Sequence, residues 1–106
     1  DTVEFPGHWR DGVAQCALGS LDAVLLDEGI AEGDGVRIVM RPEWLTLHPD
    51  GANATVTSIA YAGHDALVTL ELADGARVRS RLAAPDLPRP GDRVRVSVRR
   101  PALVYL

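Results

Sequence analysis

The side chains in this chain that are suited to binding a metal ion are His8, His48, His64 and the single cysteine, Cys16. Ligands that share one strand or helix stand two or four residues apart, because only those spacings point side chains to the same face. No two of these four residues have such a spacing, and the histidines lie beside turn residues. We therefore expect loop or surface histidines and no metal site. One cysteine also excludes an internal disulfide and a cysteine-rich zinc site.

Residue types also limit the catalytic chemistry. The chain has no lysine, since all eleven positive charges are arginine, and this excludes a Schiff-base lysine and a phosphate-loop lysine. Asp22, Asp27 and Glu28 are candidates for acid–base work, but no nucleophile or histidine lies near them in the sequence. An active site requires such partners in one constellation. We expect no active site in this chain.

The arginines are concentrated in one part of the sequence. Residues 77–100 contain eight arginines and two acids, a balance of +6, whereas residues 1–76 contain three arginines and thirteen acids, a balance of −10. Alternation places the arginines of each strand on a shared face. The first predicted strand carries Arg77, Arg79 and Arg81 on one face, and the second carries Arg93, Arg95 and Arg99. If the two strands are neighbours, these arginines form a basic wall, which requires acids opposite it.

Two explanations for the acids opposite such a wall remain open. In the first, Asp22, Asp27, Glu28 and Glu32 cover the wall within one molecule. In the second, a symmetric partner supplies them, and complementary patches make a dimer. Single-stranded nucleic acid is a poor alternative occupant, because it requires aromatic platforms and residues 77–100 contain none. The net charge of −4 also disfavours nucleic acid.

Hydrophobic residues alternate with polar ones along most of the chain, which predicts short half-buried strands. The predicted strands cover residues 12–18, 36–40, 56–61, 66–72, 77–82 and 92–99. Residues 20–28 are compatible with a helix or a strand. Turns are predicted at 49–51, 62–65 and 73–75, and a proline-rich loop at 85–91.

Six to nine short strands with close turns predict an all-β fold, a small OB-like barrel with additional flanking N-terminal strands. We expect one domain over residues 1–106, with the flanking strands in 1–35 and the barrel in 36–106. The longest aliphatic run, residues 23–26, is far too short for a membrane helix, and the N-terminus has no signal-peptide pattern. Because the chain does not begin with methionine, we expect it to be part of a longer protein.

The order of motifs from residue 36 onward resembles the transport-associated OB (TOBE) domain, the C-terminal part of many ABC-importer ATP-binding subunits. A strand leads to Arg41-Pro42-Glu43 and a short strand; a second strand ends in Tyr61-x-Gly63. Next come a hairpin at 72–75 and the Pro-Gly91-Asp92 motif, which leads into the last long strand. The chain ends with a short strand that carries an aromatic residue. Residues 12–21 are similar to the segment before the barrel in importers of the ferric-iron type.

This resemblance implies a regulatory and dimerisation domain of a bacterial ferric-iron importer, without catalytic, cofactor-binding or metal residues of its own. ATP and magnesium would bind only in an ATPase domain, which this chain lacks. The implied partners are that ATPase domain, a second copy and the membrane permease subunits, with no nucleic acid and no membrane insertion. The implied location is cytoplasmic, at the inner membrane.

The motif residues Arg41, Pro42, Glu43, Tyr61, Gly63, Gly91 and Asp92 are the candidates for a regulatory contact. Pro42 ends strand pairing, so its charged neighbours flank a bend, where they either form a clamping ion pair or contact a partner domain. The arginines Arg77, Arg79, Arg81, Arg93 and Arg95 are the candidates for a charge-complementary interface. The alternative function is a stand-alone module that binds oxyanions such as molybdate or sulfate, because arginines and turn amides suit tetrahedral anions.

Overall fold

The structure is a computed structural model that describes residues 2–49, 53–83 and 87–106. Across these ranges the regular elements are strands and one 3-10 turn, η1, so the all-β prediction is confirmed. The described strands number eleven, more than the six to nine expected. The elements are β1 (Val3–Arg10), β2 (Val13–Cys16), β3 (Gly19–Leu21), β4 (Ala23–Leu25), β5 (Gly35–Met40), η1 (Pro42–Trp44), β6 (Leu45–His48), β7 (Ala54–Ala62), β8 (Asp65–Leu72), β9 (Arg77–Ala83), β10 (Arg93–Val98) and β11 (Ala102–Tyr105).

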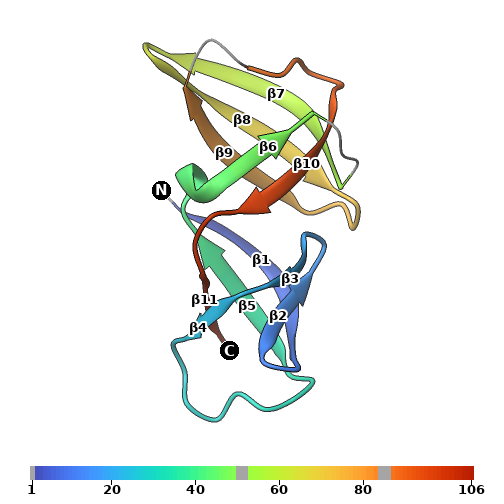
Figure 1. The fold of residues 1–106 in the computed structure, drawn as a ribbon, viewed down its shortest axis with the longest axis vertical. Coiled ribbons are helices and arrows are strands. Elements are labelled where there is room, and N and C mark those ends of the chain that lie inside the picture. The colour runs from blue at the N-terminus through green and yellow to red at the C-terminus, as the bar shows by residue number, and fades with distance from the viewer. Residues whose placement is uncertain (1, 50–52, 84–86) are drawn as a thin grey trace.

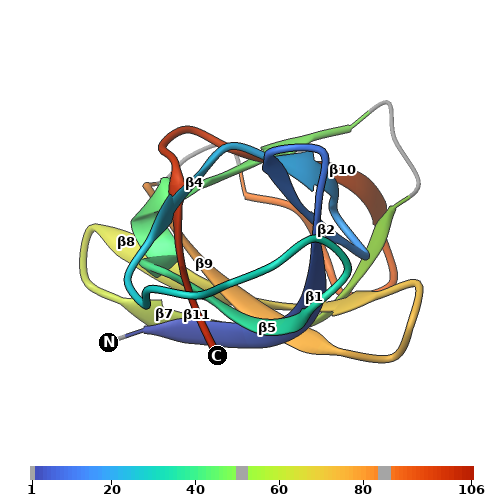
Figure 2. The same ribbon diagram turned by 90° about the horizontal axis from the view of Figure 1, so that it is seen from below.

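The strands form two curled sheets that are stacked end to end (Figure 1). The lower lobe is a six-stranded sheet in the order β3-β2-β1-β5-β11-β4, and the upper lobe is a five-stranded sheet in the order β6-β10-β7-β8-β9. This stacking gives a molecule of 43 × 24 × 18 Å. Seen along its long axis, the strands run around the periphery, as expected for an OB-like fold (Figure 2).

The chain crosses between the lobes twice. It leaves the lower lobe after β5, builds the whole upper lobe, and returns after β10 to place β11 between β5 and β4. Strand β11 is antiparallel to β5 and parallel to β4, and Leu26 N–H extends that pairing by donating to Val104 O at 2.8 Å. Within the N-terminal segment, β1 is therefore hydrogen-bonded to β5, and β4 to β11. The division of the chain at residue 35 remains a prediction.

In the upper lobe the predicted alternation is confirmed. The side chains of Val68, Leu70 and Leu72 on β8 are all buried, while the intervening residues are more exposed. Strand β8 pairs along its length with both β7 and β9, which explains this burial. At the β8–β9 hairpin Gly75 has φ +86°, a conformation that residues with a side chain rarely adopt.

Strand β1 was not predicted, because Pro6 and Gly7 interrupt the pattern of its residues. Proline lacks an N–H donor, so it disfavours an interior strand. Residues 3–7 of β1, however, pair only with β5, and β2 joins from His8 onward. The missing donor therefore faces an open edge. The ambiguous segment 20–28 forms the end of β3 and all of β4, followed by bends, and it contains no helix.

The hydrophobic core is one continuous cluster that extends through both lobes. Phe5 and Ile38 belong to it from the lower lobe, and Leu45 and Leu70 from the upper lobe. Because apolar side chains of the two sheets pack against one shared core, we expect the lobes to unfold as a single unit.

Two predicted connections fall partly outside the described residues: the turn at 49–51 and the loop at 85–91 both include residues that the structure does not describe. Of the residues that it does describe, no helix is both long and apolar enough to span a membrane.

Candidate functional site

The motif Arg41-Pro42-Glu43 forms the first crossing between the lobes. Pro42 is buried at the start of η1, while Arg41 and Glu43 are exposed. The second crossing packs directly against the first: Arg99 N–H donates to Trp44 O at 2.9 Å, and the Arg99 guanidinium donates to Glu43 O at 2.5 Å. The bend is therefore clamped by Arg99 through backbone carbonyls. An ion pair of Arg41 or Glu43 is not found among the residues described.

The second motif, Tyr61 and Gly63, lies at the β7–β8 hairpin at the top of the molecule (Figure 1). Gly63 has φ +67°, which allows the tight turn. Tyr61 is 73% exposed. An exposed aromatic at a hairpin end is suited to contact with another chain.

The third motif, Gly91 and Asp92, shapes the turn that leads into β10. The Asp92 carboxylate accepts a hydrogen bond from Arg89 N–H at 2.9 Å. On the backbone, Gly91 N–H donates to Val56 O and Val56 N–H donates to Asp92 O, at 2.7 and 2.8 Å. These contacts fix β10 against β7. The structure thus does not bring the three motifs together: they lie at the crossing, at a hairpin end and in a turn.

The two arginine-bearing strands are not neighbours. Strands β7 and β8 stand between β10 and β9 in the hydrogen-bonded order. On β9 the arginines pair across to β8: Arg77 lies 3.8 Å from Glu71, and Arg81 lies 3.3 Å from Asp65. Opposite charges on adjacent strands stabilise such a sheet face. The acids beside the β9 arginines thus come from β8, which neither of the two explanations included.

The acids of the N-terminal part have other roles. Asp27 accepts a hydrogen bond from Leu106 N–H at 2.8 Å, and the Glu32 carboxylate accepts one from Asp11 N–H at 3.0 Å. Asp22 differs, because it borders a hollow between the lobes that Arg95 of β10 also lines.

The histidines and the cysteine are not grouped. In the described part of the chain no three residues of the His, Cys, Asp and Glu types come together as metal ligands would. His48 Nε2 lies 3.0 Å from Ser97 Oγ, a contact between β6 and β10. Burial of the Cys16 thiol raises its pKa; a hydrogen bond from the Leu18 backbone lowers it, and the charge of Asp74 raises it further. A raised pKa makes the thiol less reactive near neutral pH.

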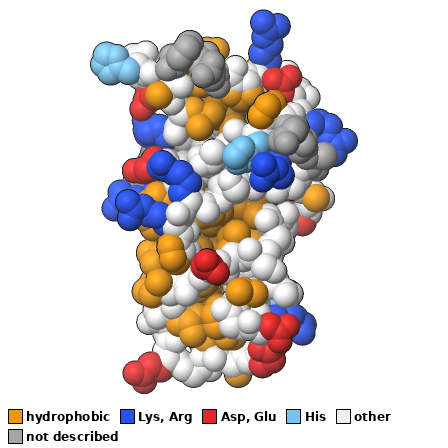
Figure 3. Space-filling view, viewed as in Figure 1, with side chains coloured by type: hydrophobic (Ala, Val, Ile, Leu, Met, Phe, Trp, Pro, Cys, Tyr) orange, Lys and Arg blue, Asp and Glu red, His pale blue; other side chains and the backbone are white. Residues whose placement is uncertain are grey.

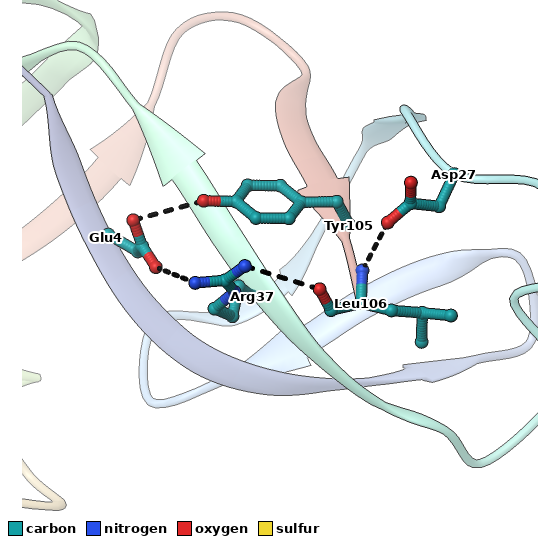
Figure 4. A network of polar contacts seen from close by, with 5 residues as sticks. All are labelled: Glu4, Asp27, Arg37, Tyr105 and Leu106. Atoms are coloured by element: carbon teal, nitrogen blue, oxygen red, sulfur yellow. Dashed lines mark hydrogen bonds and ion pairs between the residues drawn. The ribbon is translucent and has the colours of Figure 1, made fainter.

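A network that the sequence did not predict anchors the C-terminal strand (Figure 4). Glu4 Oε1 lies 3.4 Å from Arg37 Nη1, and Tyr105 Oη donates to Glu4 Oε2 at 3.2 Å. The Arg37 guanidinium also lies 4.4 Å from the centre of the Tyr105 ring and donates to Leu106 O at 3.5 Å. These residues are far apart in the sequence, and their only signal was the aromatic residue near the end of the chain.

Comparison with known proteins supports the same family as the motifs. The family described as TOBE domain matches residues 38–106. The chain is 35% identical over 112 aligned residues to the Fe(3+) ions import ATP-binding protein FbpC 1 of Rhodococcus jostii (strain RHA1), covering 99% of this chain and 31% of that protein. The chain therefore spans about a third of the length of this relative.

Among solved structures, the cytoplasmic molybdate-binding protein ModG with molybdate bound superimposes with a TM-score of 0.77, at 21% identity. The match covers 95% of this chain and 93% of that chain, and it supports the OB-like fold. With the family match extending over most of the chain and the motifs in the expected order, this chain belongs to the TOBE domain family.

Proposed function

We propose that this chain is the C-terminal regulatory and dimerisation part of an ABC-importer ATP-binding subunit, of the ferric-iron type. The observation that carries the proposal is the match to the ferric-iron import protein, which covers nearly all of this chain and about a third of that protein. A segment of that proportion is typical of an accessory domain. ATP hydrolysis would then occur in another domain of the same subunit, with ATP and magnesium bound there.

In this proposal the domain pairs with a second copy in the cytoplasm, below the membrane permease subunits. The exposed features of the fold suit such contacts, because Tyr61 projects from a hairpin and Arg41 and Glu43 project from the crossing. The candidate regulatory residues and the arginine interface remain part of this proposal. A domain that regulates by contact requires exposed motif residues on a rigid core.

The first test is to sequence the coding DNA immediately upstream of the Asp1 codon. We expect it to continue in frame into a domain with the phosphate-loop pattern G-x-x-x-x-G-K-[ST]. In the full subunit, removal of residues 1–106, which share one core, should leave ATP binding intact and alter the regulation of iron uptake. A start codon directly before Asp1 would contradict the proposal.

The second test addresses the dimer. Sedimentation of the chain at low and high salt should show a dimer that weakens as salt rises, because exposed charge pairs are screened. A monomer under all conditions would contradict charge-complementary pairing, although it would leave the assignment to an importer subunit standing.

A second candidate function is a stand-alone oxyanion-binding module, and the fold similarity to a molybdate-binding protein favours it. Titration calorimetry with molybdate, tungstate, sulfate and phosphate discriminates between the two candidates. Micromolar binding of one of these ions would favour the oxyanion module. The absence of binding would favour the regulatory domain.

A further inference from the structure

A hollow of about 410 Å³ lies between the two lobes. Its lower wall is the β2–β3 turn together with β3 and Asp22, and its upper wall is β10 with Asn53. The second crossing, Arg99 to Pro101, closes one end. The lining comes from both lobes, so a molecule bound in the hollow would contact both. Figure 1 shows how the two lobes are stacked.

Positive charge predominates around this hollow. Among the described residues that line it, Arg95 from β10 and Arg99 and Arg100 from the crossing carry positive charge, and Asp22 carries negative charge. Arg99 is held in place by its hydrogen bond to Glu43 O. Figure 3 shows arginine side chains above the middle of this face, with apolar side chains between them and the lower lobe. A guanidinium binds phosphoryl and carboxylate groups through two parallel hydrogen bonds.

The remaining lining is of two kinds. Ser20 and Ser97 contribute hydroxyl groups, and Leu18, Leu21 and Val98 contribute apolar surface. Asn53 fixes the upper wall, because its side-chain amide exchanges two hydrogen bonds with the Val96 backbone, at 2.7 and 3.2 Å. Cationic groups around an apolar floor are complementary to an organic molecule that carries several negative charges.

We propose that this hollow binds a small organic polyanion, with phosphoryl or carboxylate groups on the three arginines and its organic part on the apolar floor. The volume supports an organic ligand, because about 410 Å³ falls within the range of roughly 300–1,000 Å³ that is usual for small-molecule pockets. A single tetrahedral oxyanion would engage one or two of the arginines and leave the apolar floor uncovered. This inference goes beyond the proposed regulatory function and does not depend on the transported substrate.

The test is titration calorimetry of the full chain with four probes: ADP, citrate, pyrophosphate and orthophosphate. ADP and citrate distinguish phosphoryl from carboxylate recognition. We expect ADP or citrate to bind saturably and at least about tenfold more tightly than orthophosphate, because several guanidinium contacts form at once. The tighter probe should also raise the melting temperature, since it binds only the folded state.

Two variants test the location. Arg100→Gln should weaken the tighter probe by about fivefold, since a charged hydrogen bond is lost at an exposed site. Arg100 makes no side-chain hydrogen bond or ion pair to another described residue, so the fold should be unaffected. Asp22→Asn should strengthen binding by about threefold, because it removes a negative charge that lines the hollow. The matched control is Arg79→Gln, which removes the same charge from β9, outside the hollow.

Three results would overturn the proposal. The first is no saturable binding of ADP or citrate at millimolar concentration. The second is orthophosphate binding as tightly as the organic probes, which would favour the oxyanion module instead. The third is an Arg79→Gln effect equal to that of Arg100→Gln with no effect of Asp22→Asn, which would indicate general charge attraction. None of these results bears on whether the coding sequence continues upstream into an ATPase domain.

Discussion

Both lobes are β-sheets, but they are assembled from the chain in different ways. The upper lobe is one continuous stretch of chain, in which β7, β8 and β9 follow each other through hairpins. The lower lobe joins the two ends of the sequence, because β11 pairs with β5 and β4. Its polar contacts accordingly connect residues such as Glu4 and Tyr105, which lie 101 positions apart. Hairpins thus pair β7, β8 and β9, whereas the pairing of β10 with β6 and β7, like the closure of the lower lobe, joins segments distant in the sequence.

The lobes also differ in charge. Segments 1–40 and 101–106 contain eight acids and two arginines, a balance of −6, while residues 41–100 contain seven acids and nine arginines, a balance of +2. Since opposite charges attract, this asymmetry favours the stacked arrangement of the lobes within one molecule. The shared core, however, contributes the larger share of stability, because burial of apolar surface exceeds exposed charge pairs in free energy.

The largest expected effect tests whether the lobes unfold together. Leu70→Ala in the upper lobe and Ile38→Ala in the lower lobe each remove a fully buried side chain. Each should lower the free energy of unfolding by about 2–5 kcal/mol. Because one core joins the lobes, NMR signals from both lobes should disappear in a single urea transition. Separate midpoints for the two lobes would contradict the single folding unit.

A second prediction concerns the close packing of β1 in the lower lobe. A Cβ at Gly7 would lie 2.4 Å from Ile38 Cδ1 and 2.7 Å from the Gln15 carbonyl oxygen. Gly7→Ala should therefore cost about 1–3 kcal/mol of stability, measured by urea unfolding, because the backbone of β2 cannot move away freely. Gly35→Ala on β5 is the matched control, since a Cβ there meets no heavy atom within 4 Å. Equal losses of stability for the two variants would contradict the close packing of β1 against Ile38 and β2.

The third prediction tests closure of the chain. Arg37→Gln removes the ion pair with Glu4 and the contact with the Tyr105 ring, and should cost about 1 kcal/mol at low salt. Tyr105→Phe loses only the hydrogen bond to Glu4 and should cost less than Arg37→Gln. Hydrogen exchange of the β11 amides should accelerate in Arg37→Gln and leave the β8 amides unchanged. Equal acceleration in β8 would show that the network stabilises the whole molecule rather than the C-terminal strand.

The smallest effect concerns the electrostatic influence of one lobe on the other at Cys16, whose thiol has a pKa raised mainly by burial and in part by Asp74 of the β8–β9 hairpin. The unfolded thiol ionises from about pH 8.5, whereas the folded thiol ionises only at higher pH. The stability contribution is therefore complete below about pH 8.5 and falls as pH rises toward the folded pKa. The melting temperature should therefore decline at alkaline pH, and Cys16→Ala should remove the part of that decline that is caused by ionisation of the thiol.

The rate of Cys16 alkylation at pH 8 is an independent measure of how burial and Asp74 affect the thiol. It should be several-fold slower in the folded chain than in urea, because burial disfavours the thiolate. Asp74→Asn should raise the rate slightly by removing the nearby charge. An unchanged rate would show that the hairpin does not influence Cys16.

Much of the upper lobe could be predicted from the sequence. The alternation in β8, β9 and β10 predicts which residues face the core, because side chains along a strand repeat with a period of two. The glycines predict where the hairpin turns lie. Strand β1 could not be predicted in this way, because a strand tolerates a proline such as Pro6 only where the missing N–H donor faces an open edge. Whether that edge is open depends on which strands pair with β1, and the sequence does not show this.

The candidate site shows the same limit. The Arg41, Tyr61 and Asp92 motifs identified the family by their order, yet they lie in three separate places. The predicted wall of arginines required β9 and β10 to be adjacent, and strand order is a property of long-range pairing. The hairpin predicted at 73–75 already places β8 beside β9, but the acids that pair with Arg77 and Arg81 lie on β8 and were not among the partners considered.

By itself the sequence determined the all-β class, the inward faces of the longer strands and the family, because these depend on local periodicity and on the order of short motifs. Only the tertiary structure decided that β11 returns to the lower lobe, that Arg99 clamps the crossing, and that Arg95 and Arg100 face Asp22 across one hollow. The physical reason is that these contacts connect residues distant in the sequence. Their proximity follows from burying one shared core, and no local pattern encodes it.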